Sequence, residues 1–266
     1  MAPISSSTKS STQNQFVGKL SQLPWWLIII ILVGVVLFYN FLSNETYVAI
    51  LSRVRSGIVL TVVVAGVSYI IAIVIGLIVG LGRVSKNPII YNLATLYVQI
   101  VRGVPILVLI FYVALVIIPP LLTLFGIRAA TFDFSFRAVI ALAVAYGGFE
   151  AETFRAGIQS IGRGQMEAAR SLGMSYIQAM RYIILPQAVR RILPPLGNDF
   201  ISILKDSSLV SVLGVNDITN LARLYAASSF RYPETYNTLA FMYLTMTLIL
   251  SLIVKAIENR LAKSSQ

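Results

Sequence analysis

Six runs of mostly apolar residues divide this chain, and each is about as long as a helix that crosses a lipid bilayer. A bilayer core of about 30 Å needs roughly 20 apolar residues in a helix that rises about 1.5 Å per residue. Charges and turn residues delimit candidate spans at 24–42, 57–82, 89–118, 137–158, 194–214 and 236–257. With 57% hydrophobic and 12% charged residues, the chain is too apolar for a water-soluble domain. We therefore expect an all-α fold, a polytopic transmembrane helical bundle of six spans.

The distribution of Lys and Arg sets the expected orientation in the membrane. The formal net charge is +11, from 21 Lys and Arg against 10 Asp and Glu. In a soluble protein this excess would suggest a nucleic-acid partner, but in a membrane protein basic residues gather in cytoplasmic loops. Placing both termini inside puts most basic residues on the cytoplasmic side, above all in the loop 159–193, although Arg53 and Arg55 fall outside. We therefore expect a multi-pass plasma (inner) membrane protein with cytoplasmic termini and no nucleic-acid partner.

The residues before the second span have a different character. Residues 1–22 are rich in Ser, Thr and Gln and have no apolar face, which predicts a disordered cytoplasmic tail. The apolar run that follows is longer than most signal-peptide cores and lacks a clear small-residue cleavage site before Glu45. We therefore interpret 23–51 as a retained extra N-terminal span with an external loop.

The loop between the fourth and fifth predicted spans has strong local helix signals. Its sequence at 164–188 is GQMEAARSLGMSYIQAMRYIILPQA. Gly173 can adopt the left-handed conformation that closes a helix, and Ser175 with Gln178 matches a capping box for the next one. Pro186 is expected to end that second helix, because proline cannot continue the hydrogen-bond ladder. The pattern predicts a compact helix-turn-helix, and its simplest interpretation is an amphipathic connector.

The spacing within this loop resembles the loop motif of permeases from ATP-binding cassette (ABC) importers: Glu-Ala-Ala at 167–169, then Gly173, then Leu-Pro at 185–186. Further segments resemble the branch that carries histidine, glutamine, glutamate or arginine, and the resemblance covers about 52–261. They are RGVP at 102–105, FEAETFRAGIQSIGRGQMEAARSLGMS at 149–175, LPQAVRRILPPLGNDFISILKDSSL at 185–209 and IENRL at 257–261. Leu109 and Glu150 depart from residues common in this branch, which leaves the carried amino acid open.

The resemblance implies an architecture and a set of partners. Residues 52–266 would form the importer's transmembrane domain with a five-span core, and 159–193 would be its cytoplasmic coupling loop. The loop would dock on an ATPase subunit, and the resemblance assigns this coupling to Glu167, Ala168, Ala169, Gly173, Leu185 and Pro186. The implied partners are two ATPase subunits, a second permease copy or a paralogue, a periplasmic or surface amino-acid-binding protein, an amino-acid substrate and membrane lipid. The chain has no GxxxxGK[ST] loop, so we expect ATP hydrolysis on a separate chain.

Charged residues within the predicted spans are candidates for a substrate path, because a charge at mid-bilayer normally faces protein or water. The candidates are Arg102, Glu150, Glu152, Lys205 and Asp206. An amino acid needs donors for its carboxylate and acceptors for its ammonium group. Structural roles are equally open: Arg102 could reach toward the membrane surface, Lys205 and Asp206 could neutralise each other, and Glu152 could pair with Arg155 one turn later.

Two other functional classes compete with this interpretation. A secondary transporter driven by an ion gradient would often show inverted repeats with matching broken helices, and no such halves are evident. An integral membrane enzyme would need a catalytic constellation, yet the chain contains no Cys and no His, and no arrangement of Ser, Lys or carboxylates stands out. We therefore expect a transport subunit with no catalytic residues, no cofactor and no metal.

Overall fold

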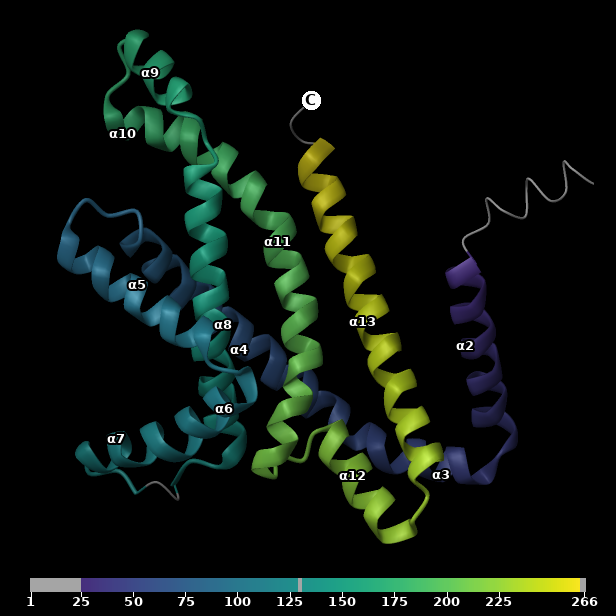
Figure 1. The fold of residues 1–266 in the computed structure, drawn as a ribbon. Helices are drawn as coiled ribbons and strands as arrows, with labels where there is room; N and C mark the ends of the chain where they lie inside the picture. The colour runs from purple at the N-terminus through teal and green to yellow at the C-terminus, as the bar shows by residue number, and fades with distance from the viewer. Residues whose placement is uncertain (1–24, 129–130, 264–266) are drawn as a thin grey trace, which may run out of the picture. The chain divides into compact units, whose positions relative to one another are not determined.

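The computed structural model describes residues 25–128 and 131–263, and every regular element in these ranges is helical (Figure 1). The predicted disordered tail, 1–22, lies outside the described residues. The chain divides into two compact units, 1–49 and 50–266. The expectation of an all-helical membrane protein therefore holds for the described part of the chain.

The first unit contains one apolar helix and the start of a second. Helix α2 spans Trp25–Ser43, and helix α3 spans Glu45–Val54 and continues into the second unit. The Asn44 side chain accepts a hydrogen bond of 2.9 Å from the backbone N–H of Thr46, which caps the start of α3. The rings of Phe41 and Tyr47 meet edge to face, with centroids 5.4 Å apart.

The second unit contains the remaining helices. In chain order they are a 3₁₀ turn Arg55–Gly57, α4 Ile58–Gly82, α5 Pro88–Gly103, α6 Ile106–Phe111, a π-helical turn Tyr112–Ile117, α7 Ile118–Leu124, α8 Phe134–Gln159, α9 Arg163–Ser171, α10 Tyr176–Ala179, a second π-helical turn Met180–Ile184, α11 Leu185–Asp206, a 3₁₀ segment Ser207–Leu213, α12 Ile218–Ser229 and α13 Tyr232–Lys263. Helices α9 and α10 lie at one end of this unit, and α12 lies at the other (Figure 1).

The core of the second unit is built on the close packing of α4 against α8. Gly76 faces Glu150 and Gly80 faces Phe154, so the two helices run in the same direction. A Cβ atom at either glycine would overlap the facing residue, which means that only glycine permits this approach. Apolar side chains from α4, α6, α8, α11 and the 3₁₀ segment Ser207–Leu213 complete the largest buried cluster.

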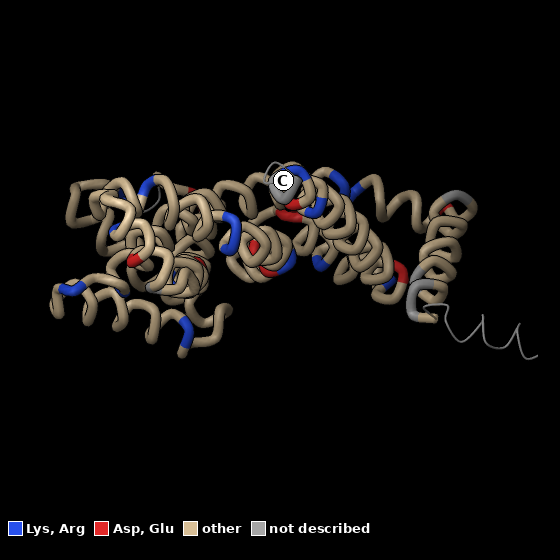
Figure 2. The backbone as a smooth tube through the Cα atoms, turned by 90° about the horizontal axis from the view of Figure 1, so that it is seen from above, with Lys and Arg blue, Asp and Glu red and all other residues tan. Residues whose placement is uncertain are grey.

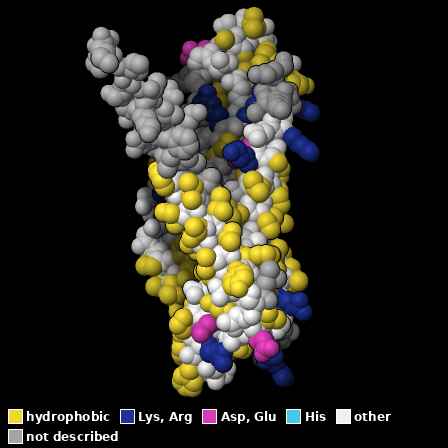
Figure 3. Space-filling model, turned by 90° about the vertical axis from the view of Figure 1, so that its right-hand side faces the viewer, with side chains coloured by type: hydrophobic (Ala, Val, Ile, Leu, Met, Phe, Trp, Pro, Cys, Tyr) yellow, Lys and Arg dark blue, Asp and Glu magenta, His cyan; other side chains and the backbone are white. Residues whose placement is uncertain are grey.

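Large apolar side chains cover much of the surface, as expected for a protein in lipid. Figure 3 shows apolar side chains across the middle of one face and charged side chains toward its two ends. Figure 2 shows that most of the helical tube carries no charge and that basic positions outnumber acidic ones. Burial in lipid would remove this exposed apolar area from water, at about 25 cal/mol per Å².

The prediction of six spans is not confirmed. Among the described residues, four helical stretches are long and apolar enough to cross a membrane, and a shorter apolar stretch covers Ile31–Phe41. The four are Glu45–Gly82, Ile106–Leu124, Phe134–Gln159 and Tyr232–Arg260. The predicted fifth span, 194–214, corresponds to α11 and its 3₁₀ extension. This segment begins nine residues earlier, at Leu185, and it contains five charged residues: Arg190, Arg191, Asp199, Lys205 and Asp206.

The prediction of one span at 89–118 is wrong. Helix α5 ends at Gly103, Val104 is extended with φ −103° and ψ 136°, and a new helix begins at Ile106. Pro105 explains the break, because proline cannot donate a backbone hydrogen bond and pushes the preceding residue out of the helical region. The apolar helical stretch then continues to Leu124 through a π-helical turn.

The prediction that Pro186 ends the second helix of the loop is also wrong. The chain stays helical from Tyr176 to Asp206, and the π-helical turn Met180–Ile184 immediately precedes the proline. A proline ring inside an α-helix clashes with the carbonyl four residues earlier, and a π-turn widens the helix at that place. The same long helix also contains Pro194 and Pro195 in its interior.

Candidate functional site

The loop at the end of α8 is a helix-turn-helix held by local hydrogen bonds. At the end of α9, the N–H of Gly173 donates to the Arg170 carbonyl at 3.0 Å, and the N–H of Met174 donates to the Ala169 carbonyl at 3.2 Å. Gly173 has φ +83°, and this pair of bonds is the Schellman motif that satisfies the last carbonyls of a helix. The predicted glycine turn is therefore confirmed.

The start of α10 carries the predicted capping box. The Ser175 hydroxyl accepts from the Gln178 backbone N–H at 3.3 Å, and the Gln178 side-chain oxygen accepts from the Ser175 backbone N–H at 2.8 Å. The two bonds satisfy donors that the first turn of a helix leaves unpaired. Both helices of the loop thus have defined ends.

A small core of its own joins the loop to α8 and α11. Ile161, Ile184, Ala188 and Ile192 are buried together, with Met166 and other apolar side chains packed against them. This packing makes the loop an extension of two long helices, and a segment held this way transmits a displacement with little internal deformation.

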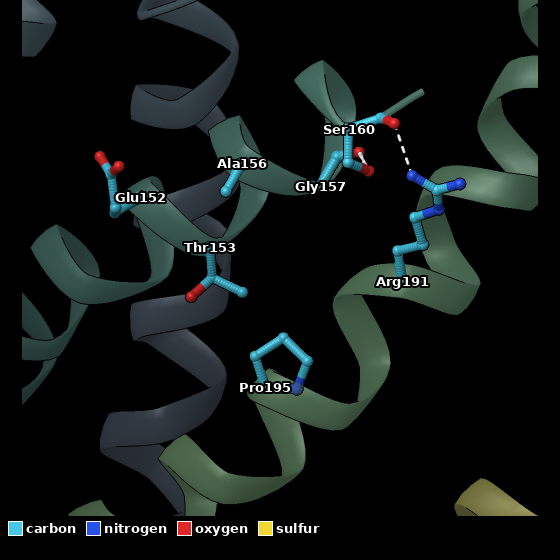
Figure 4. Close-up of a pocket in the computed structure, with 7 residues that line it drawn as sticks. All are labelled: Glu152, Thr153, Ala156, Gly157, Ser160, Arg191 and Pro195. Atoms are coloured by element: carbon cyan, nitrogen blue, oxygen red, sulfur yellow. Dashed lines mark hydrogen bonds between the residues drawn. The ribbon is translucent and has the colours of Figure 1, made fainter. Parts of the chain in front are cut away.

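Hydrogen bonds across the base of the loop add to this packing. A guanidinium nitrogen of Arg191 on α11 donates to the carbonyl of Ser160 at the end of α8 (Figure 4). The Gln187 side-chain amide donates to Gln165 Oε1 at 3.4 Å. A cavity of about 320 Å³ lies between α8 and α11 beside the Arg191 contact, lined by Thr153, Gly157 and Pro195 among others.

The residues that the sequence assigned to coupling lie on this loop with different exposures. Glu167 and Ala168 are exposed on α9, whereas Ala169 is buried. Leu185 and Pro186 are exposed at the start of α11. Around them lies a surface that we call the apolar tip, which consists of Leu172, Tyr176, Ile177 and Tyr182, all more than half exposed.

Glu152 is the centre of a charged group that we call the arginine cluster. It forms ion pairs with Arg83 at the end of α4 and with Arg155 one turn along α8, and Arg102 Nη1 near the end of α5 lies 3.9 Å from Glu152 Oε2. In Figure 4 the Glu152 carboxylate points away from α11. The cluster links α8 to the C-terminal ends of α4 and α5, and the pairing of Glu152 with Arg155 is the structural alternative weighed above.

Glu150, in contrast to Glu152, forms no ion pair or hydrogen bond among the described residues. Its side chain is fully buried, and neither carboxylate oxygen has a hydrogen-bond partner among the described residues. A buried polar group without a partner costs about 1 to 3 kcal/mol, and more when it is charged. Such a group in a membrane helix needs an explanation beyond packing.

The remaining candidates do not form a single site with Glu150. Asp206 accepts a hydrogen bond of 2.8 Å from the Tyr146 hydroxyl, Lys205 is exposed, and no ion pair joins Lys205 to Asp206 among the described residues. Arg102 is half exposed within the arginine cluster. The structure therefore groups Arg102 with Glu152 and leaves Glu150, Lys205 and Asp206 apart from that cluster.

Sequence reasoning missed several contributors. Arg83 and Arg191 were used only to orient the chain, and Tyr146 and Asp199 were not singled out, although Asp199 lies 3.5 Å from the Thr153 hydroxyl. A polar or charged residue at the end of an apolar run was the available signal for Arg83. Within 25–128 and 131–263, no group of three or more His, Cys, Asp and Glu is placed to hold a metal ion.

Long apolar helices with charged groups near their ends define a membrane-embedded helical protein. Comparison with known proteins agrees. The chain belongs to the family of binding-protein-dependent transport system inner membrane components, whose family model matches residues 72–263. Proteins of this family are permease subunits of ABC transporters, and a separate subunit hydrolyses ATP.

Named relatives narrow the similarity to amino-acid transport. The glutamine transport system permease protein GlnP of Escherichia coli is 35% identical over 189 residues, covering 71% of this chain and 84% of GlnP. The L-cystine transport system permease protein TcyL of Bacillus subtilis is 36% identical over 204 residues, covering 77% and 85%. The relatives thus carry different amino acids.

Solved structures share the fold. One chain of an amino acid ABC transporter crystallised with histidines is 37% identical, with a TM-score of 0.70 over 83% of this chain and 98% of that one. A chain of the MetNI methionine ABC transporter is 20% identical, with a TM-score of 0.65 over 82% and 99%, and at that identity it supports the fold alone.

Proposed function

We propose that this chain is the permease subunit of an ATP-driven importer for polar or charged amino acids, which an external binding protein delivers. In this proposal α9 and α10 form the coupling element that receives force from an ATPase subunit. The transmembrane domain would assemble with two ATPase subunits and a second permease copy or a paralogue. Relatives named for glutamine and cystine transport support the substrate class.

The observation that carries the coupling proposal is a stiff loop with an exposed apolar surface. Exposure of the apolar tip to water is unfavourable, and binding of a partner protein would remove this apolar surface from water. The loop resists deformation because the Schellman motif, the capping box and the buried cluster around Ile161 hold it in one conformation. A displacement at Glu167 or Gly173 would then move α8 and α11 as connected rods.

The test is reconstitution with candidate ATPase and binding-protein subunits. We expect Ile177→Ser in the apolar tip to lower substrate-stimulated ATP hydrolysis and uptake by roughly tenfold, as loss of a well-buried apolar contact does at an interface. Leu252→Ser is the matched control, because Leu252 is 69% exposed on α13 and lies outside the loop. Glu167→Ala should have the same effect as Ile177→Ser without reducing membrane insertion. Undiminished uptake in both loop variants would exclude the loop as the coupling element.

We further propose that Glu150 accepts the ammonium group of a substrate when the packed helices separate. Its carboxylate oxygens have no partner in this conformation, whereas Glu152 and Asp206 are already engaged. Arg102 and Lys205 remain candidate donors for the substrate carboxylate, since both side chains are accessible. Glu150→Gln should lower uptake of cationic and of neutral amino acids about tenfold, because both carry the α-ammonium group. Undiminished uptake of both substrates would contradict this role.

The topology is part of the same proposal. We propose that α2 and α11 also cross the membrane, giving six spans, and that both termini and the α9–α10 loop face the cytoplasm. Because the chain contains no Cys, a single Glu167→Cys variant reports its own accessibility. A membrane-impermeant thiol reagent should label it in inverted vesicles and not in intact cells. Labelling from outside intact cells would reverse the orientation.

A secondary transporter is the second candidate, and the reconstituted system separates the two. Uptake by the importer requires ATP and persists when ion gradients are collapsed. Uptake that needs no ATPase subunit and stops with the gradient would favour the secondary transporter.

A further inference from the structure

A polar crevice at the end of α8 is not explained by coupling or by substrate transport. Its volume is about 540 Å³, and it lies beside the turn that joins α4 to α5. Its lining comprises Arg83, Val84, Ser85, Tyr91, Ile158, Gln159 and Ile161. A guanidinium, two hydroxyls and an amide thus face one space, and all of them can donate hydrogen bonds.

The charge around this crevice is not balanced. In the arginine cluster a single carboxylate, that of Glu152, is shared by three guanidinium groups. Three cations against one anion leave a surplus of positive charge, and Arg83 is the least exposed of the three arginines.

Arg83 has unused capacity for an anion. Its side chain is 13% exposed, and its Nε atom is buried without a hydrogen-bond partner among the described residues. A guanidinium presents a planar fork of donors that matches the oxygens of a phosphate group. The crevice is therefore lined by a partly desolvated cation, whose Nη1 pairs with Glu152 and whose guanidinium has further donors.

Exposed apolar side chains lie on the two helices whose connecting turn borders the crevice. Ile78 and Leu81, at the end of α4, are 66% and 50% exposed, and Ile89, at the start of α5, is 68% exposed. The crevice thus lies where an apolar helix ends, which is the depth of lipid headgroups for a spanning helix. A ligand with a phosphate and adjoining hydrocarbon fits both the polar crevice and the apolar side chains of α4 and α5. Free phosphate fits only the polar crevice.

We propose that this crevice binds the phosphate headgroup of an anionic phospholipid, with Arg83, Ser85, Tyr91 and Gln159 as donors and with acyl chains along the exposed apolar faces of α4 and α5. The bound lipid would supply the anion that the arginine cluster lacks and would hold the ends of α4, α5 and α8 together. This inference requires only that the chain is embedded in a membrane, and it does not depend on which amino acid is carried.

The test uses the delipidated full chain in detergent, titrated with short-chain phosphatidylglycerol, with phosphatidylcholine of the same chain length, and with inorganic phosphate. Native mass spectrometry measures bound lipid, and thermal unfolding measures its effect on stability. We expect phosphatidylglycerol to bind about tenfold tighter than phosphatidylcholine, because the choline cation opposes the surplus charge. Inorganic phosphate raising the melting temperature as much as phosphatidylglycerol would overturn the lipid assignment in favour of a free anion.

Two substitutions with opposite expected effects separate ligand binding from a merely structural cluster. Arg83→Gln should weaken phosphatidylglycerol binding about tenfold, and Glu152→Gln should strengthen it severalfold, because the competing carboxylate is gone. Arg128→Gln, which removes a basic residue outside the crevice, should change nothing. Weakening by Glu152→Gln, or equal behaviour of Arg83→Gln and Arg128→Gln, would overturn the proposal.

A further variant covers the case in which Arg83→Gln does not fold. The double variant Ser85→Ala with Tyr91→Phe removes two donors from the crevice and leaves every ion pair of the cluster intact. It should weaken phosphatidylglycerol binding roughly threefold or more. Unchanged binding in this variant would also overturn the proposal.

Discussion

Glu150 and Glu152 lie two residues apart on α8, yet their surroundings are opposite. Glu150 is packed against Gly76 of α4, fully buried and without a hydrogen-bond partner among the described residues. Glu152 is partly exposed and shared by three arginines. In an α-helix, residues i and i+2 are separated by about 200° around the axis, so the two carboxylates face different flanks of α8.

The comparison shows how one helix serves two purposes. The flank at Glu150 uses small residues to bring two backbones together. The flank at Glu152 is within reach of long arginine side chains from the ends of neighbouring helices. Close packing fixes the position of α8 against α4, and the ion pairs fix the ends of the helices near the loop.

The largest expected effect tests the packed flank. Gly76→Leu should destabilise the protein by about 3 kcal/mol or prevent folding, because the new side chain overlaps the backbone of α8 at Glu150. Gly66→Leu on the same helix is the control, since a Cβ there meets nothing within 4 Å. Thermal unfolding in detergent measures both. Equal melting temperatures for the two variants would show that α4 and α8 do not pack in this way.

A smaller effect tests the polar flank. Glu152→Gln should lower stability by about 1 to 2 kcal/mol, between the values for exposed and buried ion pairs, because it leaves three guanidiniums without their anion. Glu167→Gln, which removes an exposed carboxylate on α9, should change stability by no more than about 0.5 kcal/mol. The same unfolding measurement at low and high salt would show a salt-dependent difference for Glu152 only. A Glu152 variant as stable as the Glu167 variant would remove the contrast between the two flanks.

The smallest effect has the opposite sign. Glu150→Met should raise stability by about 1 kcal/mol, because it replaces a carboxylate without a partner by an apolar side chain of similar length. The stabilised variant should transport poorly if Glu150 contacts substrate, as expected where function and stability conflict. Thermal unfolding and uptake measured on one preparation give both answers. A loss of stability would mean that Glu150 has a partner in the assembled protein.

Local signals in the sequence predicted much of the candidate coupling loop. The Gly173 turn and the capping box of Ser175 and Gln178 each depend on residues within about one helical turn, so they could be identified without knowledge of the fold. Pro186 misled the prediction because the π-helical turn that accommodates it leaves no clear mark in the sequence. Pro105 is a break signal of the same local kind, and the structure interrupts the helix there.

By itself the sequence determined that the chain is helical and membrane-embedded, because apolar runs of bilayer length permit little else. Only the tertiary structure decided which of two neighbouring carboxylates is paired. Arg83 is 69 residues from Glu152 along the chain, and their contact depends on how α4 crosses α8. Helical periodicity places Glu150 and Glu152 on different flanks of α8. The partner of each flank is set by the packing of helices that are distant in the sequence, and a local sequence pattern does not predict that packing.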